Sequence, residues 1–219
     1  MHRKWIGIDI TQLAITLIKS RLATAFGSTV SSRFVVLGEP ESLEDARSLA
    51  REDPYQFQLW ALGLVNARPA DLKKGMDKGI DGRLYFHDER EGGKTNQVIL
   101  SVKGGHLKPE YIRELPGIVD REKAAIGVLI SLETPTKHMR GEAASAGFYE
   151  NVWWGRFPKV QLITVEELLN GKTIDYPHVG KSERTFRPAP RQVLKVAEPL
   201  GLFEAFPSPD QSPKKRRKK

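Results

Sequence analysis

Three polar residues in the middle of the chain have the types and spacing needed to hydrolyse a phosphodiester bond. Asp81 directly precedes one strand-like segment, and Ser101 and Lys103 lie at the end of the next. A carboxylate can hold a divalent cation, and a lysine nearby can position water and stabilise the charged transition state. This chemistry assigns the metal to Asp81 and the catalytic cation to Lys103, with Ser101 as a secondary metal ligand, bound directly or through water.

A hairpin must bring these side chains together. The segments 83–87 and 97–103 are strand-like, and a polar loop, 88–96, joins them. Residues two apart in a strand share a face, so Ser101 and Lys103 point to one side while Val98, Leu100 and Val102 point into the core. The hairpin would place the Asp81 carboxylate beside the first of these faces. The same spacing also fits a solvated ion pair, which is the commoner arrangement.

The remaining elements predict an α/β fold, with a mixed central sheet and helices on both faces. A restriction-endonuclease-like domain is expected at 33–171, a strand–helix segment at 1–25 and a disordered Pro-rich, basic extension at 172–219. The expected strands lie at 5–10, 34–37, 83–87, 97–103, 126–131 and 160–163. The expected helices lie at 11–22, from Ser42, at 53–65, at 109–123, at 137–146 and from Thr164 to Gly171.

The amino-acid sequence around the hairpin resembles that of a known family. Gly79-Ile80-Asp81-Gly82, a polar loop and a strand that ends Ser101-Val102-Lys103, all preceded by a helix, resemble the Mrr-like branch of the PD-(D/E)XK restriction endonuclease superfamily. The resemblance spans about 33–171. It implies an endonuclease of a restriction–modification system that acts on double-stranded DNA with Mg²⁺ or Mn²⁺, with Asp81 as the metal-binding aspartate and Lys103 as the motif lysine.

Two positions depart from the pattern of that superfamily. Ser101 stands where a Glu or Gln is usual, and a hydroxyl is a poorer ligand for a divalent cation than a carboxylate. Gln56 and Gln58 occupy the helix that often carries a Glu, so Asp77 or Glu110 is the candidate for the missing acid. These departures keep a second hypothesis open, a catalytically inactive DNA-binding module.

The segment from Arg3 to Ile10 resembles a different enzyme, the exocyclic-amino (adenine or cytosine) DNA methyltransferases. In that family a strand ends in an acid that binds the ribose of S-adenosylmethionine, and Asp9 holds the equivalent place. The Gly-rich cofactor loop and the catalytic motif do not occur in this chain. S-adenosylmethionine is therefore expected only in a longer fusion with an upstream methyltransferase half, for which this chain would be an accessory DNA-recognition part. The alternative, which we favour, is that Asp9 caps the helix that begins near Thr11.

Charge and composition narrow the partners. The 219 residues carry a net charge of +8 and include no cysteine, which excludes disulfides, thiolate metal sites and a cysteine nucleophile. From Ser208 onward the chain has six basic residues and one acid, so this segment contributes five of the eight net positive charges and the rest contributes three. A basic tail favours non-specific contact with nucleic acid phosphates. No segment is apolar enough for a membrane span, so a cytoplasmic protein is expected, and a homodimer remains open.

Overall fold

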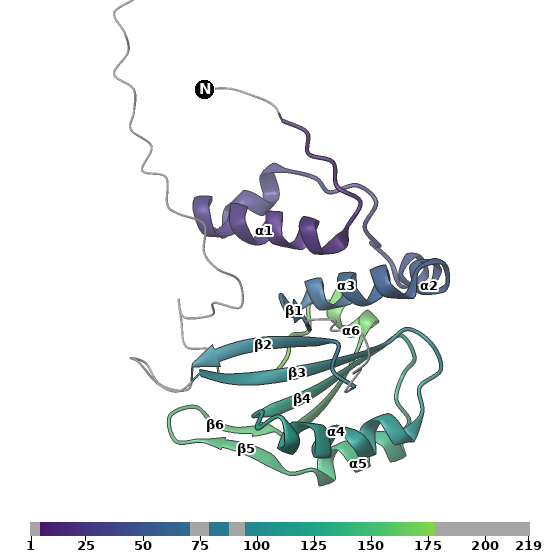
Figure 1. Ribbon diagram of the computed structural model, residues 1–219, viewed down its shortest axis with the longest axis vertical. Helices are drawn as coiled ribbons and strands as arrows, with labels where there is room; N and C mark the ends of the chain where they lie inside the picture. The colour runs from purple at the N-terminus through teal and green to yellow at the C-terminus, as the bar shows by residue number, and fades with distance from the viewer. Residues whose placement is uncertain (1–4, 71–78, 88–94, 178–219) are drawn as a thin grey trace, which may run out of the picture. The chain divides into compact units, whose positions relative to one another are not determined.

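A five-stranded mixed sheet forms the centre of the protein (Figure 1). The computed structural model describes residues 5–70, 79–87 and 95–177. The strand order is β1-β2-β3-β4-β7, where β2 is antiparallel to β1 and β3, and β3, β4 and β7 are parallel. The strands are β1 (Arg68–Pro69), β2 (Gly82–His87), β3 (Thr95–Lys103), β4 (Ile126–Ser131) and β7 (Val160–Thr164). The predicted mixed α/β fold is confirmed.

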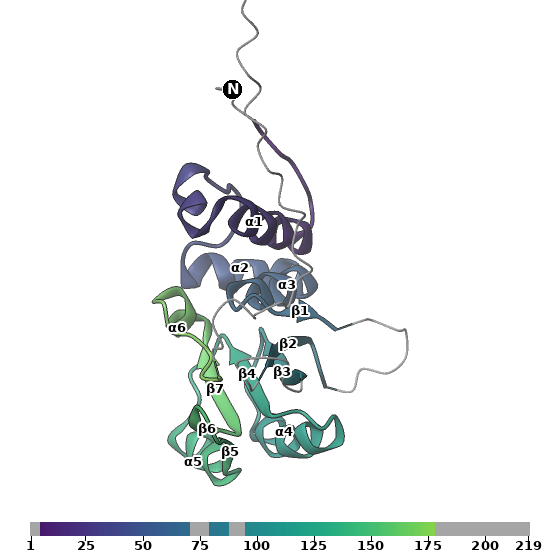
Figure 2. The same cartoon turned by 90° about the vertical axis from the view of Figure 1, so that its left-hand side faces the viewer.

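Helices cover both faces of this sheet. Figures 1 and 2 show α3 and α6 on one face, with α2 beside α3, and α4 and α5 on the other. Their bounds are α2 (Leu43–Glu52), α3 (Pro54–Leu64), α4 (Pro109–Arg121), α5 (Lys137–Ser145) and α6 (Val165–Leu169). A sheet that is covered on both faces needs central strands that are apolar throughout, and β4 is buried at every residue.

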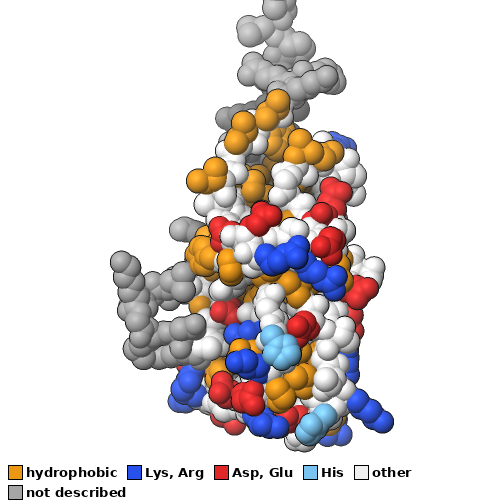
Figure 3. All heavy atoms as spheres, turned by 90° about the vertical axis from the view of Figure 1, so that its right-hand side faces the viewer, with side chains coloured by type: hydrophobic (Ala, Val, Ile, Leu, Met, Phe, Trp, Pro, Cys, Tyr) orange, Lys and Arg blue, Asp and Glu red, His pale blue; other side chains and the backbone are white. Residues whose placement is uncertain are grey.

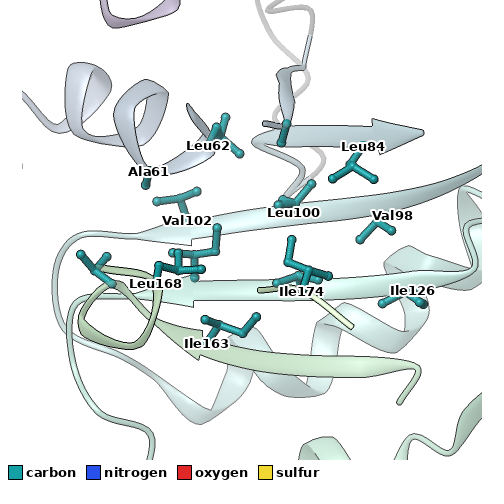
Figure 4. Packing of buried hydrophobic residues seen from close by; sticks show 14 of the residues in the cluster. Ala61, Leu62, Leu84, Val98, Leu100, Val102, Ile126, Ile163, Leu168 and Ile174 are labelled. Atoms are coloured by element: carbon teal, nitrogen blue, oxygen red, sulfur yellow. The ribbon is translucent and has the colours of Figure 1, made fainter. Parts of the chain in front are cut away.

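The alternation of side chains along β3 builds two cores. Leu100 and Val102 point toward α3, where Ala61 and Leu62 lie over them (Figure 4). Ile99 points to the opposite face and packs with the α4 side chains. Ser101 and Lys103 continue the Ile99 face, because residues two apart in a strand lie on the same side. As predicted, these two side chains point away from the Leu100 and Val102 face. They lie on the face of the sheet that α4 covers.

Three helices begin at the capping residues that the sequence predicted. Ser42 and Thr164 each begin a capping box, in which their hydroxyls accept the backbone N–H of Asp45 and Glu167 and those carboxylates bond back. The Asp53 side chain accepts the N–H groups of the two residues after Pro54, which takes the first helical position. These predictions are confirmed, and the helix ends differ from the expected ones by a few residues.

The strands predicted at 5–10 and 34–37 are wrong. Neither segment forms a strand or pairs with one in the described part of the chain. Ile6 and Ile8 are each 91% exposed and Leu37 is 88% exposed, so neither segment is buried. The apolar residue types favour a strand, but a strand also needs a neighbour, which residue type does not reveal.

The predicted N-terminal helix is confirmed as α1 (Gln12–Phe26), and a 3₁₀ helix, η1 (Ser28–Arg33), follows it. The Thr11 hydroxyl caps α1 by accepting the Ala14 N–H. The helix contacts α3, where Thr16 is buried against Gly63. A Cβ atom at Gly63 would lie 2.6 Å from the Thr16 hydroxyl, so the glycine allows the two helices to approach closely.

Other features were not anticipated. Besides β1, a two-stranded hairpin of β5 (Phe148–Asn151) and β6 (Gly155–Pro158) follows α5. The packed body also continues past Gly171, because Ile174 and Tyr176 are buried in the α3-side core. None of the helices among the described residues is long and apolar enough to cross a membrane.

Candidate functional site

Asp81 lies at the junction of three strands. Its backbone N–H donates to the Leu100 carbonyl at 2.8 Å, and its own carbonyl accepts the Ala70 N–H at 2.9 Å. The register pairs Gly82 with Leu100, which sets Asp81 opposite Ser101. The predicted hairpin is therefore present, and it brings Asp81 and Ser101 together as expected.

The Asp81 carboxylate accepts hydrogen bonds from two neighbouring residues of β3. Its Oδ2 accepts the Val102 N–H at 2.6 Å and the Ser101 hydroxyl at 3.2 Å. The Val102 N–H lies on the β2 side of β3, but β2 begins only at Gly82 and the chain turns at Gly79, which has a φ of 72°. A buried N–H needs an acceptor, and Val102 is 8% exposed. The carboxylate thus replaces the strand carbonyl that would otherwise continue the ladder.

Lys103 ends β3 and lies beside α4. Its Nζ is 4.8 Å from the centroid of the Tyr111 ring, within range of a cation–π interaction. Tyr111 belongs to the first turn of α4 and was not among the predicted site residues. Spacing along the chain does not indicate this contact, because it joins a strand end to a helix start across a loop.

A second carboxylate at this edge of the sheet also bonds to backbone. Glu133 follows β4, and its Oε2 accepts the Leu107 N–H at 2.8 Å, while its carboxylate pairs with His106 at 3.2 Å. The Leu107 bond, with a smaller contribution from His106, lowers the pKa of Glu133 below its ordinary value. Glu133 connects the loop after β4 to the loop after β3, a role that the sequence did not indicate.

Glu110, Gln56 and Gln58 lie on helices and not on the hairpin that carries Asp81 and Ser101. Asp77 lies outside the described residues. Glu110 is exposed in the first turn of α4. Gln56 lies on α3, on the opposite face of the sheet, where its side-chain oxygen accepts the Gln12 N–H at 3.2 Å. Gln58 is on the same helix.

Asp9 bonds to Thr11, the residue that caps α1. Its Oδ1 accepts the backbone N–H of Thr11 at 2.8 Å and the Thr11 hydroxyl at 2.7 Å. These bonds, the backbone one first, lower the pKa of Asp9. The helix cap itself is Thr11, so the interpretation of Asp9 as the cap is corrected: Asp9 holds the capping residue in place.

The described donor set does not fit a Mg²⁺ or Mn²⁺ site. Mg²⁺ requires near-octahedral oxygen coordination, usually with one or two carboxylates. Among residues 5–70, 79–87 and 95–177, no three His, Cys, Asp or Glu side chains gather as metal ligands would. The Asp81 Oδ2 atom already accepts two hydrogen bonds, and the Ser101 hydroxyl directs its proton at it. In the described residues, the Asp81 Oδ2 atom thus serves as a hydrogen-bond acceptor for β3.

Comparison with known families agrees with this geometry. A family model described as NACHT-associated inactive Restriction Endonuclease 1 matches residues 56–170, from α3 to the end of α6. No curated protein and no solved structure matches the chain. The restriction-endonuclease-like domain expected from the sequence is thus confirmed. The match does not reach residues 1–25, so the methyltransferase resemblance stays a prediction.

Proposed function

Because the chain belongs to the NACHT-associated inactive restriction endonuclease family, we propose that it is a non-catalytic module that binds double-stranded DNA without cleaving it. The observation that carries this proposal is the bond from the Val102 N–H to the Asp81 carboxylate. A residue in the place of a catalytic metal ligand serves here as a structural acceptor. In keeping with the family description, the module acts in association with a NACHT domain.

The serine beside Asp81 supports the loss of catalysis. Phosphodiester hydrolysis with a metal needs carboxylate oxygens to hold the cation and neutralise developing charge. Ser101 offers a hydroxyl in place of the usual Glu or Gln, and it is only 5% exposed. A serine hydroxyl is uncharged, and this one donates its hydrogen bond to Asp81.

Lysine side chains at the ends of the parallel strands support the proposed contact with DNA. Lys103 ends β3, Lys108 precedes α4 and Lys137 begins α5, all at the edge where β3 and β4 end. Figure 3 views the molecule from this side and shows Lys, Arg and His side chains beside acidic ones. Lysines next to helix N-termini are suited to phosphate oxygens, which position a protein on DNA without reading its sequence.

A metal-dependent endonuclease is the second candidate. The observation that favours it is that Asp81 and Lys103 lie at the same end of one hairpin, as in an active nuclease. This candidate needs a further acid, for which Asp77, outside the described residues, is the nearest in sequence.

Binding to a short DNA duplex at several salt concentrations tests the proposal. Full-length chain is expected to bind, and truncation after Pro207, which removes six basic residues and one acid, should lower the affinity and flatten the salt dependence. Each phosphate that the protein no longer neutralises reduces the slope of log K against log salt by about 0.9. Fluorescence anisotropy measures both quantities, and a full-length chain that does not bind at about 50 mM salt, where such binding is strong, contradicts the proposal.

The truncated chain then tests the strand edge. Replacing Lys108 and Lys137 together by Gln should weaken its remaining DNA binding and lower the slope by about 2. The matched control replaces Arg121 and Lys159 together by Gln. Arg121 is the last residue of α4 and Lys159 directly precedes β7, so both lie at the other end of the sheet, and the slope should stay unchanged. Equal effects of the two pairs would mean that net charge, and not this edge, determines binding.

A further inference from the structure

The tip of the β5–β6 hairpin presents aromatic side chains to solvent. Val152 is 96% exposed, Trp153 74% and Trp154 37%. The Asn151 side-chain oxygen accepts the backbone N–H groups of both tryptophans at 2.9 Å, which fixes the shape of the turn. Adjacent exposed tryptophans on an ordered turn are costly to leave in water, and tryptophan is enriched among residues that dominate protein interfaces.

A cavity of about 330 Å³ lies at the base of the same hairpin, between α5 and the edge strand β7. Most of its lining is apolar, including Ala143, Ala144, Pro158 and Leu162. Pro158 is the last residue of β6, so one hairpin carries the exposed tryptophans at its tip and borders the cavity at its base. The exposed side chains of the tip are apolar, and so is most of the cavity lining.

We propose that the occupant of this cavity is the hairpin tip of a second copy of this chain. Two hairpins that lie side by side and antiparallel place each tip at the base of the other. One two-fold axis then forms both contacts at once, which is the self-complementary arrangement of most homodimers. This inference is independent of DNA binding.

The charges beside tip and cavity are also complementary. Arg140 lines the cavity, is exposed, and interacts electrostatically with Glu167 of its own chain. Glu150, on β5, is 72% exposed and pairs with Arg156 of its own hairpin at 3.2 Å. In the antiparallel arrangement Glu150 of one copy faces Arg140 of the other. This charge pair favours a second copy over an uncharged apolar ligand.

The contact area is small, so the dimer is expected to be weak. Two hairpin tips bury less than the about 1,200–2,000 Å² of a standard interface, and interfaces below that size are typically transient. We therefore expect dissociation in the micromolar range. Sedimentation velocity of the full-length chain between about 1 and 200 µM should show a monomer–dimer equilibrium.

Two variants separate the tip from the cavity. Trp153→Ser with Trp154→Ser removes the tip, and Ala144→Phe fills the cavity from an exposed helix position. Each should weaken dimerisation at least tenfold while the circular dichroism spectrum and Tm stay as in the wild type. Val35→Ser, which changes a residue that is 82% exposed elsewhere on the chain, is the control and should leave dimerisation unchanged.

Mixing the tip and cavity variants gives the decisive result. A dimer of either variant alone forms neither contact. In a mixed dimer the intact tip of the cavity variant can enter the intact cavity of the tip variant, so one of the two contacts is restored. The mixture should therefore associate more tightly than either variant alone. Charge reversal adds a second check, because Glu150→Arg and Arg140→Glu should each weaken the dimer and together restore it. A wild type that remains monomeric at about 200 µM, or a dimer that both variants leave intact, overturns the proposal.

Discussion

Replacing Asp81 by Ala is expected to lower the free energy of unfolding by about 1–3 kcal/mol, the usual cost of a buried polar group left without a partner. The group in question is the Val102 N–H, which donates to the Asp81 carboxylate at 2.6 Å from a buried position. For a chain of this size the loss corresponds to a fall in Tm of roughly 2–12 °C. Urea and thermal denaturation measure it.

Asp81→Asn is the matched variant. An asparagine oxygen at the same place can still accept the Val102 N–H, so most of the stability should be retained although the negative charge is lost. Ser101→Ala removes only the longer bond, 3.2 Å, and should cost less than Asp81→Ala. If Asp81→Ala is as stable as the wild type, or if Ala and Asn are equally destabilising, the carboxylate does not serve as a ladder acceptor.

Replacing Phe57 by Ala is expected to cost about 3–5 kcal/mol, the usual loss for a fully buried phenylalanine. Phe57 is 1% exposed, and its ring packs against Trp60 with 5.9 Å between ring centroids. A Cβ atom at Gly104 would lie 2.9 Å from the ring, so Phe57 packs α3 directly onto the turn that follows Lys103. Chemical denaturation measures the loss.

Tyr55→Ala on the same helix is the control for Phe57. Its side chain is 46% exposed, so its replacement should cost less than about 1 kcal/mol. Similar losses for the two variants would contradict the packing of α3 on the end of β3. The Phe57 variant should also perturb the positions of Ser101 and Lys103, because the same turn ends their strand.

The elements around the site were predictable because their signals are local. Capping residues such as Ser42 and Thr164 fix helix starts through bonds to residues three positions away. The hairpin followed from two strand-like runs and a polar loop. The segment at 5–10 carries the same apolar residue types as a buried strand, yet whether a partner strand exists depends on the rest of the fold, and here none of the described strands pairs with it.

The chemistry of the site was predictable only in part. Residue types identified Asp81, Lys103 and the weak ligand Ser101, and strand register accounts for the contact between Asp81 and Ser101. One partner of Asp81 is the Val102 backbone N–H, a group that every residue except proline has, so no residue type could indicate it. The same holds for Glu133, which accepts the N–H of Leu107 from 26 positions away. Bonds between a side chain and the backbone are thus the part of this site that residue types do not predict.

Incubation of plasmid and linear DNA, methylated and unmethylated, with the full-length chain and Mg²⁺ or Mn²⁺ tests the central claim most directly. The account predicts that the chain binds the DNA, as a shift in electrophoresis shows, and that no nicked or linear product forms above the level without protein. Asp81→Asn, which keeps the Val102 acceptor, should behave as the wild type does. Cleavage by the wild type that depends on the divalent cation and is lost in Asp81→Asn would contradict the account and establish the endonuclease.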